Sequence, residues 1–123
     1  MAPDDAEKLR QVVRVLTEVQ EAGRGFDMTQ WQCETAACAI GWSVRDAWFQ
    51  ARGLSAGKYG APCYQGKEGW RAVWAFFPGL PMETVNNVFA VDRYRAFPWE
   101  RQAPVRLPEV VARITALLAE EPA

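Results

Sequence analysis

The chain has 123 residues and a formal net charge of −1, with 50% hydrophobic and 24% charged residues. This length and composition fit one folded domain around one hydrophobic core, and the near-neutral charge excludes a strongly basic nucleic-acid-binding surface at whole-chain level. The sequence contains no histidine, which excludes Ser-His-Asp and Cys-His catalysis within this chain.

The N-terminal segment predicts an amphipathic helix that ends at Gly23. Apolar side chains recur along it at helical spacing, namely Ala6, Leu9, Val12, Val13, Leu16 and Val19. Asp4 and Glu7 have the spacing of a capping box, so we expect Asp4 to cap the helix. Gly23 favours the left-handed backbone conformation with which many helices end.

A longer helix is predicted from about Thr35 to Arg52, with Gly53 as its stop. Its polar residues form one narrow strip, namely Ser43, Asp46 and Gln50. A helix with so little polar surface is expected to be largely surrounded by the rest of the protein. Before it, Thr29 and Gln32 have the spacing of a second capping box and predict a short helical turn.

Residues 53–69 contain five glycines and a proline, which predicts a long loop with a brief extended stretch around Tyr59–Tyr64. Two short helices follow, one ended by Pro78 and Gly79 and the other opened by Pro81. Their inward residues are Trp70, Val73, Trp74 and Phe77 in the first helix, and Met82, Val85, Val88 and Phe89 in the second.

Pro108 opens the last predicted helix, whose inward residues are Val110, Val111, Ile114, Leu117 and Leu118. Residues 91–106, which precede it, have no helical period. No segment shows a convincing strand pattern. We therefore predict an all-α fold, with a single domain over residues 1–123 that forms a compact bundle of about five helices around a largely buried central helix.

The three cysteines, Cys33, Cys38 and Cys63, are an odd number and do not suit a disulfide framework. The charged N-terminal residues do not resemble a signal peptide, and no apolar run is long enough to span a bilayer. We therefore predict a reduced, cytoplasmic protein with no membrane partner. Cys33 and Cys38 also lack the spacing of redox pairs and structural zinc sites, so no metal ligand and no cofactor are assigned.

Residues 26–42, FDMTQWQCETAACAIGW, combine two cysteines, two tryptophans and a run of small residues. Buried cysteine behaves as a small hydrophobe, and a glycine such as Gly41 costs about 1 kcal/mol relative to alanine inside a helix. We interpret the segment as a tight helix contact, in which a neighbouring ring is expected beside Gly41. The residues of this structural motif are Trp31, Cys33, Cys38, Gly41 and Trp42.

The same segment resembles a pattern found in a family of small bacterial and bacteriophage proteins. The matching positions are Phe26, Met28, Trp31, Cys33, Thr35, Ala37, Cys38, Gly41 and Trp42. The likeness continues into AFFPGLPMETVNNVF, whereas Glu34 stands where glycine is common and no histidine follows Gly41. The resemblance implies a bacterial or phage origin and a shared helical core, and it implies no reaction.

Residues 92–106, DRYRAFPWERQAPVR, alternate arginines with aromatic residues. These residue types are enriched at the hot spots of protein interfaces. We predict a partner-binding site formed by Arg93, Tyr94, Arg95, Phe97, Trp99 and Arg101. The segment could instead be a loop that its aromatic side chains anchor to the core.

The leading hypothesis is a small non-enzymatic binding or accessory protein of bacterial or phage origin that contacts an unknown protein partner, an inhibitor of a host enzyme being one form of it. No pair of carboxylates has a spacing that compels acid-base chemistry, so no catalytic residue is assigned. Two alternatives stay open. One is a metal- or thiol-dependent enzyme that uses Cys33, Cys38 and Cys63, and the other is a single-stranded nucleic-acid-binding protein that uses residues 93–106.

Overall fold

The computed structural model of the protein describes residues 1–32, 36–95 and 103–120. The α-helices are α1 (Pro3–Glu21), α2 (Ala39–Ser43), α3 (Ala47–Gln50), α4 (Trp70–Phe76), α5 (Met82–Phe89) and α6 (Leu107–Ala119). The 3₁₀ turns are η1 (Lys58–Gly60) and η2 (Val91–Arg93), and the strands are β1 (Gly25–Phe26), β2 (Ala36–Ala37), β3 (Ser55–Ala56), β4 (Pro62–Tyr64) and β5 (Lys67–Glu68). None of the described helices is both long and apolar enough to cross a membrane.

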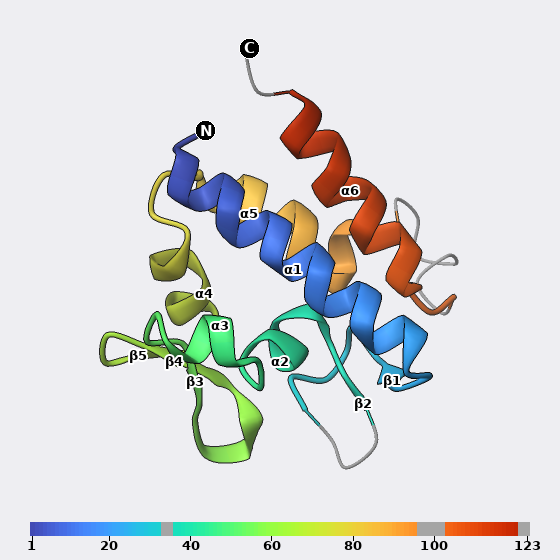
Figure 1. The fold of residues 1–123 in the computed structure, drawn as a ribbon, viewed down its shortest axis with the longest axis horizontal. Coiled ribbons are helices and arrows are strands. Elements are labelled where there is room, and N and C mark those ends of the chain that lie inside the picture. The colour runs from blue at the N-terminus through green and yellow to red at the C-terminus, as the bar shows by residue number, and fades with distance from the viewer. Residues whose placement is uncertain (33–35, 96–102, 121–123) are drawn as a thin grey trace.

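Helix α1 crosses one side of the molecule and lies alongside α6 (Figure 1). The predicted capping box at Asp4 is wrong, because the N-cap is Ala2, which offers no side-chain acceptor, and Pro3 opens the helix with a φ angle that already suits it. The predicted stop at Gly23 is confirmed. Gly23 has φ +68°, and the amide that follows it donates to the carbonyl of Val19 at 3.0 Å, which completes a Schellman end.

The prediction of an all-α fold is wrong, and so is the single helix expected over residues 35–52. That segment contains β2 and then two separate helices, α2 and α3. Cys38 and Asp46 have extended backbones, and their side chains accept hydrogen bonds from the main-chain N–H groups of Gly41 and Trp48 at 3.3 and 3.0 Å. Each side chain is therefore an N-cap at which a new short helix begins.

Two small sheets complete the fold. Strands β1 and β2 pair in parallel, and β3, β4 and β5 form an antiparallel sheet in that order inside the glycine-rich segment 53–69. Gln65 and Gly66 connect β4 to β5 with φ angles of +51° and +77°, as a two-residue hairpin of type I′ requires. Strands of two or three residues are too short to show the alternation from which a strand is predicted.

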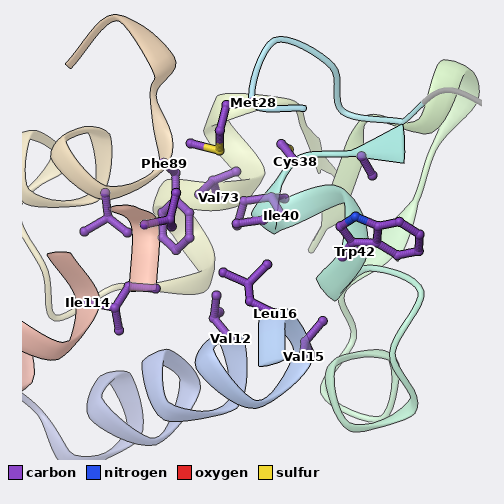
Figure 2. Packing of buried hydrophobic residues seen from close by; sticks show 14 of the residues in the cluster. Val12, Val15, Leu16, Met28, Cys38, Ile40, Trp42, Val73, Phe89 and Ile114 are labelled. Atoms are coloured by element: carbon purple, nitrogen blue, oxygen red, sulfur yellow. The ribbon is translucent and has the colours of Figure 1, made fainter. Parts of the chain in front are cut away.

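The hydrophobic core lies between α1, α2, α4, α5 and α6. Figure 2 shows Val12 and Leu16 of α1 on one side of this core, with Ile40 of α2 and Phe89 of α5 facing them. The three later helices predicted from the sequence are confirmed as α4, α5 and α6. Met82 is an exception within them, since it was expected to point inward and is 49% exposed.

Candidate functional site

The cysteine–tryptophan motif holds the main chain of Trp31 against the start of α2. A Cβ atom at Gly41 would overlap the carbonyl oxygen of Trp31 and lie 2.9 Å from the Cβ of Ala37. The group beside Gly41 is therefore a main-chain carbonyl and not the ring expected from the sequence. Trp42 is buried, and its Nε1 donates to the carbonyl of Gly25 at 2.9 Å. These contacts fix Trp31 relative to α2.

The loop before Trp31 is bonded at both ends. The Oδ1 atom of Asp27 accepts hydrogen bonds from the amide and the hydroxyl of Thr29 at 2.9 and 2.6 Å. This is an Asx turn, so the helical turn expected at Thr29 is wrong. The amide of Cys38 donates to the carbonyl of Gln30 at 3.0 Å. The loop that carries Trp31 is therefore well defined by local hydrogen bonds.

The described cysteines occupy different environments. Cys38 is buried, and burial raises the pKa of its thiol to about 11, so the thiol remains protonated at neutral pH and is a poor nucleophile. Cys63 is half-buried on β4, and Cys33 lies outside the described residues. Within the described ranges, no three His, Cys, Asp or Glu side chains are grouped as metal ligands would be.

The start of the arginine–aromatic segment is held to the core. Tyr94 is buried, its hydroxyl donates to the carbonyl of Val88, and the guanidinium of Arg113 lies 3.7 Å from the centre of its ring. Arg95 forms a salt bridge with Glu109 at 2.9 Å. Tyr94 and Arg95 therefore connect this segment to α5 and α6. The other residues predicted to bind a partner lie outside the described ranges, and these are Phe97, Trp99 and Arg101.

Arg93, in contrast, lines a pocket that the motif also lines. The pocket has a volume of about 450 Å³ and lies where the loop of residues 28–31 meets α4, α5 and η2. Its aromatic lining consists of Trp31, Trp70, Trp74 and Phe89. Met28 and Cys38 also line it, and Figure 2 places both on the side of the core away from α1. The structure thus brings Trp31 and Cys38 of the motif together with Arg93.

Two contacts organise the aromatic walls of this tryptophan pocket. The rings of Trp31 and Trp70 lie 5.1 Å apart between centroids, with 58° between their planes. The Nε1 of Trp74 donates to Oδ1 of Asn86 at 2.9 Å, which fixes the wall on α4 to α5. In the described part of the chain, the indole N–H groups of Trp31 and Trp70 have no hydrogen-bond acceptor, in contrast to that of Trp74.

Asp92 and Arg93 are the charged residues of the pocket lining, and together with Glu83, which pairs with Arg93, they sum to a charge of −1. Nη1 of Arg93 lies 2.7 Å from Oε2 of Glu83, and this hydrogen bond holds the pKa of Glu83 below its ordinary value. Asp92 lines the pocket beside this pair, and among the described residues it has neither a hydrogen-bond partner nor an ion pair within 4.0 Å. The Arg93 charge is therefore already compensated by Glu83, whereas the exposed Asp92 carboxylate interacts with Arg93 only at longer range, without a hydrogen bond or a contact ion pair.

An exposed aromatic side chain lies in the η1 turn, which contacts the residue after Trp31. A Cβ atom at Gly60 would lie 2.8 Å from the Cβ of Gln32, so the η1 turn packs against the residue that follows Trp31. Tyr59, at the tip of that turn, is 86% exposed and has φ +65°. A non-glycine residue in this conformation is uncommon. The turn that carries Tyr59 therefore contacts the residue next to Trp31, which is one wall of the pocket.

A second polar cluster lies at the start of α1. Asp5 and Lys8 are both buried, and Nζ of Lys8 donates to the carbonyl of Phe76 at 2.7 Å. Burial raises the pKa of Asp5, and the charge of Lys8 opposes that shift. Gly79 lies directly against the Asp5 carboxylate, where a side chain would not fit. The cluster joins α1 to the end of α4, which indicates a structural role.

No family model, curated protein or solved structure matched the chain in comparisons with known proteins. The functional argument therefore rests on the geometry of the pocket. Trp70 and Trp74 were expected only as core residues, and Asn86 was not expected at a site. Asp92 belongs to the segment 92–106 that was predicted to bind a partner, but it was not assigned as a site residue. One available signal was that tryptophan is rarely buried completely, so a chain with six tryptophans is expected to leave some of them partly exposed.

Proposed function

We propose that this chain is a non-enzymatic binding protein that contacts a partner protein through the tryptophan pocket and the surface next to it. The observation that carries the proposal is the convergence of Trp31, Trp70 and Trp74 on one pocket that Arg93 also lines. Tryptophan and arginine dominate interface hot spots, because they bury a large area and keep a polar group for hydrogen bonding.

The size and surroundings of the pocket support a protein partner. A volume of about 450 Å³ lies within the range of pockets that take a ligand or a large side chain. Outside the pocket, the η1 turn that packs against Gln32 carries Tyr59, which is 86% exposed. A partner protein can contact both parts, whereas a small ligand would fill only the pocket.

The proposal is tested by affinity capture with matched tryptophan variants. The resemblance of the motif to bacterial and bacteriophage proteins makes a bacterial lysate the source of partners. Trp70→Ala removes one wall of the pocket and should weaken capture of the wild-type partner roughly 30-fold, the effect of losing a hot-spot residue. Trp48→Ala is the control, since Trp48 is also half-buried but packs between Phe49 and Arg52, outside the pocket.

A second variant tests the pocket without removing a tryptophan that the fold needs. Ala90 lines the pocket and has an extended backbone that accepts any L-residue, so Ala90→Leu fills the pocket without removing a native contact. Ala90→Leu should keep the wild-type circular dichroism spectrum and lose the partner. If Trp70→Ala and Ala90→Leu both capture that partner as well as wild type does, the pocket is not the contact site.

A further inference from the structure

The walls of the tryptophan pocket suit a positively charged group. The rings of Trp31 and Trp70 have centroids 5.1 Å apart, so a cation placed against this pair can lie within about 6 Å of both centroids. Cations are attracted to the negative face of an aromatic ring, and tryptophan gives the strongest attraction. Trp74, fixed by Asn86, lines the same pocket.

The charges around the pocket also favour a positively charged ligand. Asp92 supplies an exposed carboxylate that has no hydrogen bond or contact ion pair among the described residues, although Arg93 interacts with it at longer range. Arg93 is already paired with Glu83 at 2.7 Å, so it offers little attraction to an anion. A further carboxylate, that of Asp27, does not line the pocket but accepts hydrogen bonds from Thr29, which does. The pocket is therefore complementary to a cation.

The apolar part of the lining identifies the kind of cation. Met28 and Phe89 are buried core residues that line the pocket, and they offer contact to methylene groups. Arginine and lysine side chains place an apolar stem along such a surface and keep the charged head in a polar setting. A small inorganic cation would leave this apolar surface without a contact.

We propose that the tryptophan pocket receives an arginine or lysine side chain of the partner protein, with the charged head against Trp31, Trp70 and Asp92 and the stem against Met28 and Phe89. This inference rests on the proposed function, because it names the chemistry of the partner at the same site. The unpaired indole N–H groups of Trp31 and Trp70 would then donate to main-chain carbonyls beside that side chain.

The test is a titration of the full chain followed by the indole N–H signals in proton–nitrogen correlation spectra. The probes are the N-acetyl methylamides of arginine, lysine, norleucine and glutamate. The arginine or lysine probe should shift the signals of Trp31, Trp70 and Trp74, and it should bind about tenfold more tightly than norleucine, which has the stem without the charge. The signal of Trp48 should stay in place, because Arg52 already lies 3.5 Å from its ring centre.

Two conservative variants test the charge argument without removing a wall. Asp92→Asn should weaken binding of the basic probe about threefold, and Arg93→Gln should strengthen it by a similar factor, because Glu83 is then left without its partner. Both residues are at the surface or only partly buried, so neither change is expected to unfold the chain.

The possible results separate this inference from the proposed function. Equal shifts with norleucine, a preference for glutamate, or binding of choline without binding of either basic probe would each overturn the basic side chain as the ligand. If the basic probes fail while Trp70→Ala still abolishes capture of a partner, the protein contact stands and only its chemistry is wrong. If neither probe nor partner depends on Trp70, both proposals fail.

Discussion

Replacement of Gly41 by alanine distinguishes helix propensity from packing, because the two predict changes of opposite sign in the free energy of unfolding. Gly41 lies inside α2, and alanine is better than glycine in a helix by about 1 kcal/mol. Propensity alone therefore predicts that Gly41→Ala stabilises the protein. The structure predicts the reverse, because the added methyl group would overlap the carbonyl of Trp31 and lie 2.9 Å from the Cβ of Ala37.

The expected loss of stability depends on whether the groups around Gly41 can move to make room for the added methyl group. The obstacle is main chain, and the loop that carries it is held by the hydrogen bonds of Thr29 with Asp27 and of Cys38 with Gln30. Overpacking in such a place costs about 1–3 kcal/mol, and a rigid obstacle belongs at the upper end of that range. After the gain in propensity is subtracted, we expect a net loss of about 2 kcal/mol in the free energy of unfolding.

Urea denaturation followed by tryptophan fluorescence measures this loss, and a drop of roughly 6–10 °C in Tm should accompany it. Ala47→Gly is the control, since Ala47 is exposed in α3 and its replacement reports propensity in a short helix without a packing change. A Gly41→Ala protein that equals or exceeds the stability of wild type would refute the packing argument. It would also remove the reason to regard the position of Trp31 as fixed by α2.

Three further predictions concern buried or paired side chains. Burial would raise the pKa of Asp46, but hydrogen bonds from Arg14 hold that pKa below its ordinary value of 3.8, so Asp46→Asn should cost about 2 kcal/mol in the free energy of unfolding at pH 7. A carboxylate whose pKa is lowered by folding stabilises the protein above its ordinary pKa, here 3.8, and this stabilisation is lost as the pH falls through the folded-state pKa. The difference in urea midpoint between wild type and Asp46→Asn should therefore disappear at pH values below 3.8. Because burial raises the pKa of the Cys38 thiol to about 11, this thiol should react with Ellman's reagent at least tenfold more slowly than that of Cys63 until urea unfolds the chain. Equal reaction rates would contradict a buried, protonated Cys38. Tyr94→Phe should lower the free energy of unfolding by about 1 kcal/mol, because a buried main-chain acceptor loses its donor; an unchanged thermal midpoint would show that the bond is replaced by water.

The helices that the sequence predicted correctly are those whose apolar residues repeat over two turns or more. Helices α4, α5 and α6 keep such a stripe, and each is placed as expected. The segment 35–52 failed because its apolar content continues through two helix starts. Asp46 is a common N-cap residue and could have indicated the second start, whereas cysteine is not a usual cap, and Cys38 gave no such signal.

The pocket could not be predicted from the sequence, for a different reason. Trp31 and Trp70 lie 39 positions apart in the chain, and their ring contact depends on how the loop of residues 28–31 folds back towards α4. Periodicity relates residues only within one element, so it assigned Trp70 and Trp74 to the core and treated Trp31 as a packing residue. The contact between the segments exists only after the chain has folded.

If the tryptophan pocket binds a partner as proposed, the position of Trp31 makes stability and binding depend on the same residues. Cys38 caps α2 and also lines the tryptophan pocket, while Gly41 allows the carbonyl of Trp31 to approach α2. A change at Gly41 should therefore displace one aromatic wall even in the molecules that remain folded. The indole N–H signal of Trp31 should shift in Gly41→Ala without any probe, and affinity for a basic probe should fall, whereas Ala47→Gly should leave both unchanged. The motif is then more than a core element, because the packing that it provides positions Trp31, a side chain of the proposed binding surface.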